Sequence, residues 1–124
     1  MNLFLEKRKS NIHGIGVFTK RPISSGEVFY IIPLSKTLSE PKDRIAYIGD
    51  NTYVDDDEVL NWVNHSCDPN SDLNISEAPP ALVAKRNISK GEEITVDYNK
   101  TEIRGIKTKC FCGLKNCKGE FNKF

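Results

Sequence analysis

The sequence predicts one small, mostly β domain with only short helical insertions. It has 124 residues, of which 38% are hydrophobic and 28% charged, and this composition is typical of a single globular domain. Its β-branched and aromatic residues gather in short segments bounded by Gly, Pro, Ser or Asn, which is a pattern typical of strands. Only two brief stretches carry a helical pattern.

The predicted strands span residues 3–7, 17–20, 28–34, 81–86 and 94–98. The predicted helices span residues 41–48, where Gly49 would end the helix, and residues 58–63. From Lys100 onward the apolar alternation stops, so we expect this tail to be organised by its cysteines and not by a hydrophobic face.

Two phrases in the sequence are nearly the same. Ile23-Ser-Ser-Gly26-Glu27 and Ile88-Ser-Lys-Gly91-Glu92 each place a glycine-containing turn before an apolar segment. No other segment shares this spacing, so the sequence predicts two similar turns and not a repeat array.

The charge balance gives little support for a polyanionic partner. Eighteen basic and 17 acidic residues leave a net charge of +1, which disfavours a small zinc-ribbon nucleic-acid binder, and we expect no direct nucleic-acid binding. The acidic run of residues 55–58 is interpreted as a solvated face.

The amino terminus lacks the basic-then-apolar order of a signal peptide, and no apolar run is long enough to cross a bilayer. The sequence therefore predicts an intracellular protein, in the cytoplasm or in the nucleus or nucleoid, with no membrane partner.

Three of the four cysteines, Cys110, Cys112 and Cys117, lie within eight residues. Cys110 and Cys112 are separated by one residue, and a disulfide between them would be strained. Zinc takes four ligands in a tetrahedral array, so the cluster needs one more. The candidates for this fourth ligand are Cys67, His65 and His13. A disulfide between Cys67 and Cys117 is the alternative, which an intracellular protein disfavours.

Residues 64–70, Asn-His-Ser-Cys-Asp-Pro-Asn, place polar side chains directly after the apolar Trp62-Val63. Such groups need partners in the protein or on a ligand, although an Asx-type turn capped by its own side chains is an alternative. Residues 91–98 read as a turn and then a strand that ends in Tyr98, which by itself would be a packed aromatic. Gly14-Ile15-Gly16 either lets a backbone approach a ligand or forms a simple bend.

Taken in this order, the four motifs resemble those of SET-domain protein-lysine methyltransferases with a post-SET zinc-binding tail. The resemblance covers nearly the whole chain. It implies a SET fold of several small twisted sheets with short helices, in which residues 64–70 pass beneath later residues to form a knot-like core. It also implies a SET domain over residues 1–99 and a zinc-bound post-SET tail over residues 100–124.

The resemblance further implies residue roles. Tyr98 would be the catalytic tyrosine, with Tyr47 or Tyr53 as a partner in the lysine channel. One structural zinc ion, with no position open to water, would be held by Cys67, Cys110, Cys112 and Cys117. S-adenosylmethionine would be the cosubstrate, and the residues implied to hold it are Gly14, Ile15, Gly16, Phe18, Asn64, His65, Tyr98 and Phe111.

The implied reaction moves a methyl group from S-adenosylmethionine to a lysine amine in a histone or another basic protein. An apolar channel and the nearby sulfonium would favour the neutral amine, and alignment of the reactants would supply much of the rate. The chain departs from the family pattern at Asn61-Trp62, where Arg-Phe is common, and at Val96, where an aromatic is common and where lost bulk would permit di- or trimethylation. The alternative function is a non-catalytic, zinc-stapled protein-interaction module.

Overall fold

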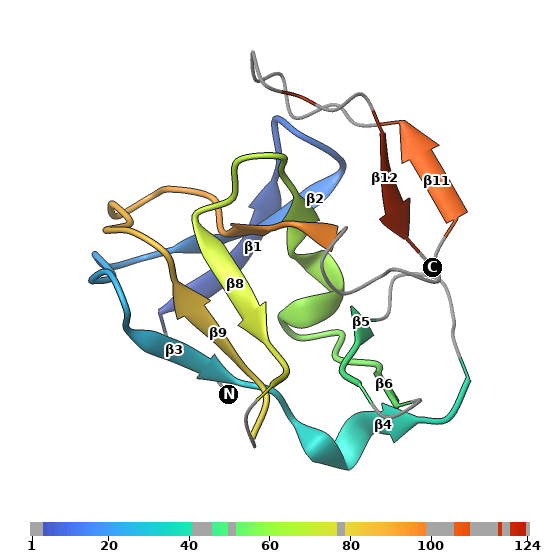
Figure 1. Cartoon of the computed structure of the whole chain (residues 1–124). Coiled ribbons are helices and arrows are strands. Elements are labelled where there is room, and N and C mark those ends of the chain that lie inside the picture. Colours follow the sequence, from blue (N-terminus) through green and yellow to red (C-terminus); the bar gives the residue numbers. More distant parts are fainter. Residues whose placement is uncertain are drawn as a thin grey trace.

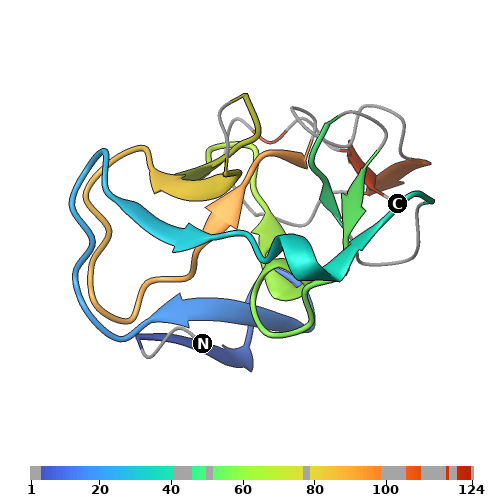
Figure 2. The same cartoon turned by 90° about the horizontal axis from the view of Figure 1, so that it is seen from below.

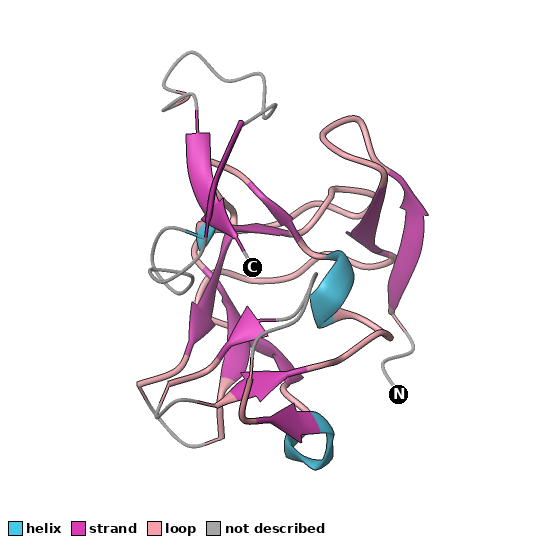
Figure 3. Cartoon of the chain, turned by 90° about the vertical axis from the view of Figure 1, so that its right-hand side faces the viewer, coloured by secondary structure: helices cyan, strands magenta, loops and turns pink. Residues whose placement is uncertain are grey.

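The computed structural model describes residues 4–40, 46–49, 52–76, 79–98, 106–109, 117 and 120–123. Within these ranges the chain is mostly β (Figure 1). The described strands form five small sheets, and four of them are purely antiparallel. Figure 3 shows how little of the chain is helical. The mostly β fold class predicted from the sequence is confirmed.

The first two strands, β1 (Leu5–Lys9) and β2 (Ile15–Thr19), form an antiparallel hairpin. A three-stranded sheet has the order β3-β9-β8, with bounds Val28–Ile31, Ala81–Ala84 and Ser71–Asn74. A second one has the order β4-β6-β5, with bounds Thr37–Leu38, Tyr53–Val54 and Ala46–Tyr47. Figure 2 shows the hairpin and the β3-β9-β8 sheet as separate layers.

Two further pairs complete the described strands. β7 (Asn64–His65) runs parallel to β10 (Thr95–Val96). β11 (Ile106–Lys109) and β12 (Glu120–Lys123) form an antiparallel pair in the tail. The described residues also include two short 3-10 helices, η1 (Leu34–Lys36) and η2 (Leu60–Trp62).

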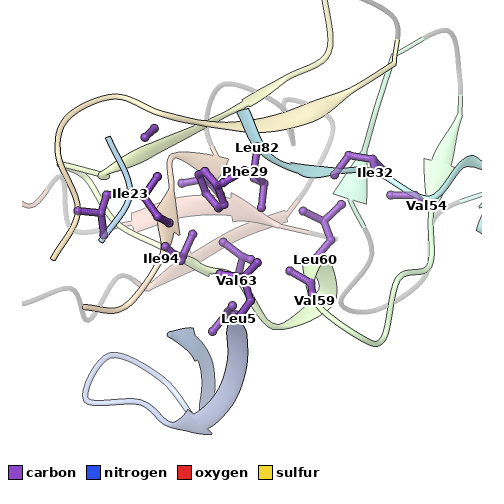
Figure 4. Close-up of a cluster of buried hydrophobic side chains, with 14 of the residues drawn as sticks. Leu5, Ile23, Phe29, Ile32, Val54, Val59, Leu60, Val63, Leu82 and Ile94 are labelled. Atoms are coloured by element: carbon purple, nitrogen blue, oxygen red, sulfur yellow. The ribbon is translucent and has the colours of Figure 1, made fainter. Parts of the chain in front are cut away.

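Among the described residues, one hydrophobic core joins the sheets formed by β1 to β10. Leu5 of β1, Phe29 of β3, Leu82 of β9 and Val63, which follows η2, all belong to the same buried cluster (Figure 4). None of these strands could bury its apolar face alone, so the removal of apolar surface from water between the sheets is what orders them.

The two similar turns pack against each other. Ile23 and Ile88 form an antiparallel bridge, with N–H to carbonyl distances of 2.9 and 2.8 Å in the two directions. In each turn the glutamate carboxylate accepts the N–H of the serine three residues earlier and pairs with an arginine six residues earlier: Glu27 with Ser24 and Arg21, and Glu92 with Ser89 and Arg86. The prediction of two similar turns is confirmed, and the structure adds that the two turns are hydrogen-bonded to each other.

The helix predicted over residues 41–48 is wrong where the structure describes it. Ala46–Tyr47 is strand β5 and pairs with β6. Gly49, with φ +93°, closes the turn between these strands, and the Ile48 N–H donates to the Thr52 carbonyl at 2.9 Å. A short apolar run without a clear period fits either element, and here the cross-strand partner decided.

The helix predicted over residues 58–63 is reduced to the single turn η2. Strand β8 was not predicted, because three of its four residues are polar. The tail contains the β11–β12 pair, so a backbone ladder and not cysteines alone organises it. In the described part of the chain, no helix has the length and apolar character that crossing a membrane requires.

Candidate active site

The site is built where two distant segments lie side by side. β7 pairs in parallel with β10, so Asn64 lies beside Thr95 and His65 beside Val96. The Ser66 N–H continues this ladder by donating to the Val96 carbonyl at 3.0 Å. The polar loop that begins at Asn64 and the strand that leads to Tyr98 therefore meet, although they are far apart in the sequence.

Tyr98 is held at both of its ends. Its hydroxyl donates a hydrogen bond to the carbonyl of Val63, the residue before Asn64. Its N–H donates to His65 Nδ1 at 3.0 Å, and the two rings meet edge to face with centroids 5.6 Å apart. The phenol oxygen is consequently fixed against a backbone carbonyl. Sequence reasoning missed the Val63 carbonyl, because a backbone group leaves no residue signature.

His65 is buried, and its partners assign its tautomer. Nδ1 accepts the Tyr98 N–H, so its lone pair is used there and the neutral ring carries its proton on Nε2. Nε2 lies 3.6 Å from Cys67 Sγ. Asp97 Oδ1 is 3.6 Å from Nδ1, but a nitrogen that accepts the Tyr98 N–H carries no proton for that carboxylate. This contact is therefore not an ion pair.

Asn64 connects this pair of strands to the first glycine motif. Its side-chain Nδ2 lies 3.0 Å from the His13 carbonyl and 3.2 Å from the Ile15 carbonyl. Gly14 lies between these two residues and has φ +46°, in the left-handed region that favours glycine. The structure thus brings together Gly14, Ile15 and Asn64, which the sequence predicted for one site.

Gly16 has a different role from Gly14. A Cβ added at Gly16 would lie 2.3 Å from Glu93 Oε2, so the missing side chain makes room for this carboxylate. Glu93 also forms a bridge with Phe18, whose ring lies 4.4 Å from the Arg8 guanidinium. Sequence reasoning did not assign Glu93 to the site. Its position just after the glycine-containing turn at Gly91 was the available signal.

The acidic run of residues 55–58 is not only a solvated face, as the sequence interpretation had it. Asp56 is fully buried and accepts hydrogen bonds from the Tyr30 hydroxyl at 2.5 Å, from the Leu60 N–H at 3.0 Å and from the Glu58 N–H at 3.2 Å. Burial, and then the Asp56 carboxylate, raise the pKa of Tyr30 far above its ordinary range.

The departure at Asn61-Trp62 belongs to this same segment. Asn61 donates to Asp55 at 2.7 Å and accepts the Asp56 N–H at 3.1 Å. The Trp62 indole N–H donates to the Asp57 carbonyl at 2.7 Å. These two residues therefore anchor η2 to the acidic run.

The two candidate channel tyrosines lie against each other. Tyr47 and Tyr53 are cross-strand partners on β5 and β6, with ring centroids 5.2 Å apart. Tyr53 is buried and Tyr47 half-buried. This arrangement does not distinguish them, so their role in a lysine channel stays a prediction.

Two of the four predicted zinc ligands are described. Cys67 and Cys117 are half-buried, and no disulfide joins these two residues, so the disulfide alternative is wrong. Cys110, Cys112 and Phe111 lie outside the described residues. The predicted zinc ligand set and the cofactor contact of Phe111 stay predictions.

Known proteins of one family are similar to this chain. The family model described as "SET domain" matches residues 14–99. The histone H3-lysine(4) N-trimethyltransferase ATX1 of Arabidopsis thaliana is 32% identical over 136 aligned positions, covering 92% of this chain and 13% of that protein. The putative histone-lysine N-methyltransferase 1 of Plasmodium falciparum is 33% identical, covering 98% of this chain and 2% of that protein. This chain therefore spans a small part of the length of these relatives.

A solved structure is similar over most of the chain. It is the crystal structure of KRYPTONITE in complex with mCHH DNA, H3(1-15) peptide and SAH, with a TM-score of 0.70 and 25% identity. The superposition covers 94% of this chain and 29% of that chain.

Proposed function

The chain belongs to the SET-domain family, and we propose that it transfers methyl groups from S-adenosylmethionine to the side-chain amine of a lysine in a protein. One observation carries this proposal. The Tyr98 hydroxyl is fixed on the Val63 carbonyl, immediately before Asn64, whose side chain contacts the backbone on both sides of Gly14. A phenol oxygen for the amine and an acceptor for the cofactor are therefore built into one site.

The residues present fit S-adenosylmethionine. The site offers the exposed residues Gly14 and Ile15, the polar side chain of Asn64 and the carboxylate of Glu93, which suit a cationic ligand with an amino-acid part. The residues that would hold the cofactor are those expected from the sequence, Gly14, Ile15, Gly16, Phe18, Asn64, His65 and Tyr98, with Phe111 from the tail. When bound, the cofactor supplies a methyl group on a sulfonium, which is a good leaving group.

The chain's own groups then have to orient the amine. The Tyr98 hydroxyl donates its hydrogen bond to the Val63 carbonyl, so its oxygen lone pairs remain to accept an amine N–H. The Val63 carbonyl has a second lone pair that can accept weak C–H contacts from the methyl group. Exclusion of water would disfavour the ammonium form of the lysine. Alignment then supplies much of the rate without a strong base.

We propose a histone or another basic protein as substrate, because the similar proteins are named histone-lysine methyltransferases. Histone methylation also favours a nuclear, intracellular location. We retain the expectation that this chain does not itself bind nucleic acid, which rests on its net charge of +1.

We also propose the finer structural features: a SET domain over residues 1–99 with a knot-like core, and a post-SET tail over residues 100–124. The tail would contribute three of the four thiolates to one structural zinc ion, and Cys67 would contribute the fourth. Four thiolates suit zinc, and the Nε2–H of His65 faces the Cys67 sulfur as an outer-shell donor would.

The deciding experiment measures binding and transfer together. Isothermal titration of the zinc-loaded protein with S-adenosylmethionine should show one saturable site per chain, and labelled methyl should appear on lysine in histones. The Asn64→Ala variant should lose cofactor binding while it keeps its fold. A folded, zinc-loaded protein that binds no cofactor would overturn the proposal in favour of a non-catalytic interaction module.

A further inference from the structure

The carboxamide of Asn64 sits in an unusual environment. Asn64 is only 9% exposed, and its Nδ2 lies within 3.2 Å of four oxygens. Two are the His13 and Ile15 carbonyls, the third is Glu93 Oε2 at 2.9 Å and the fourth is Ser10 Oγ at 3.2 Å. A nitrogen with two hydrogens is thus surrounded by acceptors.

Ser10 Oγ is an acceptor because its own hydrogen is already used. The hydroxyl lies 2.8 and 2.9 Å from the two oxygens of Glu93, which can only accept. Ser10 Oγ also receives the Ile12 N–H at 2.9 Å and the His13 N–H at 3.3 Å. Rotation of the Asn64 amide by half a turn would place its oxygen against a carboxylate and two carbonyls, so these neighbours fix one orientation.

The other end of the carboxamide is open. Within the described residues, Asn64 Oδ1 has no hydrogen-bond partner, and no side-chain oxygen or nitrogen there is both buried and unpartnered. Oδ1 is therefore accessible, although the residue as a whole is nearly covered. It is an acceptor presented outward from a buried, rigid amide.

Glu93 adds charge to this acceptor. Among the described residues, no lysine or arginine nitrogen lies within 4.0 Å of its carboxylate, whose partners are Ser10 and Asn64. An outward amide oxygen beside a carboxylate without a basic partner favours a ligand that is cationic and can donate an N–H. The sulfonium of S-adenosylmethionine has no N–H, but the ammonium of its amino-acid part has three.

We propose that Ser10 and Glu93 are positioning residues that hold the Asn64 carboxamide with its oxygen outward, where it receives the ammonium group of the cofactor. This inference rests on the proposed function. It assigns to Glu93 and Ser10 a role in cofactor affinity that is separate from methyl transfer at Tyr98.

The test compares two ligands by calorimetry. S-adenosylhomocysteine has the ammonium group, whereas 5′-methylthioadenosine lacks the whole amino-acid part. The Glu93→Gln variant should bind S-adenosylhomocysteine roughly tenfold more weakly, as expected for loss of about 1.4 kcal/mol, and should bind 5′-methylthioadenosine as the unchanged protein does. Glu27→Gln is the control, because it also removes one carboxylate charge, but from a side chain that pairs with Arg21 and Ser24 and not with Ser10 or Asn64, and both affinities should stay unchanged. Equal weakening of both ligands by Glu93→Gln would show a merely structural role and overturn the proposal.

Failure of the methyltransferase proposal can be distinguished from failure of the positioning role. If the unchanged protein binds neither ligand, the methyltransferase proposal fails. The positioning role is then read from the side-chain amide signals of Asn64 by NMR without ligand. Ser10→Ala and Glu93→Gln should each shift these signals and speed their hydrogen exchange, and Glu27→Gln should not. Unchanged Asn64 signals in both variants would overturn the positioning role.

Discussion

Single residues in this protein combine structural and chemical tasks. Asn64 bridges the glycine motif and the β7–β10 pair through one carboxamide. Tyr98 donates one hydrogen bond from its hydroxyl to the Val63 carbonyl and another from its N–H to His65. Each side chain is held by several hydrogen bonds, so its orientation is set before any ligand arrives, which lowers the ordering cost of binding.

At this scale, Tyr98→Phe should uncouple binding from chemistry. The ring remains, so cofactor affinity by calorimetry should change less than about threefold, whereas the rate of methyl transfer should fall roughly 100-fold or more because the amine loses its orienting oxygen. Tyr30→Phe removes a tyrosine hydroxyl outside the site and should retain transfer when assayed well below its melting temperature. Full activity of the Tyr98→Phe protein would exclude this tyrosine from the reaction.

Gly16→Ala should act through Glu93. The added Cβ would lie 2.3 Å from Glu93 Oε2, and the flexible end of that side chain can move away, so the fold should survive with a loss of about 1–3 kcal/mol. S-adenosylhomocysteine binding should weaken as it does in Glu93→Gln. In a double-variant cycle the two changes should not add, because they remove the same carboxylate from the same place. Additive losses would mean that Gly16 contributes independently of Glu93.

Short elements become stable here because polar side chains secure their ends. The acidic run of residues 55–58 anchors η2 through Asp56 and Asn61, and the two glutamate-capped turns support each other through the Ile23–Ile88 bridge. A strand of two residues or a helix of one turn has too few internal bonds to persist alone.

Tyr30→Phe tests the acidic segment. It removes a donor from the fully buried Asp56, and loss of a hydrogen bond to a charged group costs about 1.5–3 kcal/mol. Urea unfolding should show a free energy of unfolding lower by this amount, with cofactor affinity unchanged. A loss below about 0.5 kcal/mol, the low end for an ordinary hydrogen bond, would mean that other donors replace the tyrosine.

The paired glutamates of the two similar turns predict that the free energy of unfolding depends on pH. The Arg21 hydrogen bond lowers the pKa of Glu27 below its ordinary 4.5. Burial acts to raise the pKa of Glu92, but hydrogen bonds from Ser89, Asn70 and Arg86 together lower it. Both carboxylates therefore stabilise the fold fully above the ordinary value and lose this contribution as the pH falls through the lower folded values.

The measurement is urea unfolding at several pH values between about 5.5 and about 3, which brackets the ordinary glutamate pKa. The unchanged protein should lose more stability over this window than a Glu27→Gln, Glu92→Gln double variant, in which neither turn titrates. Other carboxylates contribute equally to both proteins, so the difference reports the turns. Parallel stability curves would show that these two contacts do not distinguish folded from unfolded chains.

For the molecule as a whole, stability depends on the hydrophobic core and on how the tail is attached to it. Among the described residues, the sheets formed by β1 to β10 share one hydrophobic cluster, and the β11–β12 pair follows Tyr98 in the sequence. A domain of this size buries limited apolar surface, so a metal that joins the tail to Cys67 would add stability where the core adds little.

Removal of the proposed zinc ion should weaken the site. Cys117→Ser should lose metal, measured by mass spectrometry of the metal content, and should lose cofactor binding and transfer together, because the tail would no longer be fixed beside Cys67 and His65. Ser89→Cys is the control, because it makes the reverse exchange of oxygen and sulfur in one of the two similar turns, and it should leave metal content unchanged. A zinc-free Cys117→Ser protein with full activity would contradict the proposal that zinc binding by the tail supports the active site.

The sequence by itself determined the mostly β class and the two similar turns, and it predicted that Gly14, Asn64 and Tyr98 belong to one site. These follow from local composition, from turn chemistry and from motifs that each occupy a few neighbouring residues. The sequence alone did not place β5, which was expected as a helix, because a short apolar run acquires its form from its partner strand.

Only the tertiary structure decided the roles of the Val63 carbonyl, Ser10, Glu93 and Asp56. Each of these groups acts through contacts with residues far away in the chain: Glu93 lies 83 positions from Ser10 and 29 from Asn64, and Tyr30 lies 26 from Asp56. The residue type of a serine, a carboxylate or a backbone carbonyl does not indicate which distant group it will contact. Its chemistry is set by packing between small sheets, which brings donors, acceptors and charge within hydrogen-bond distance.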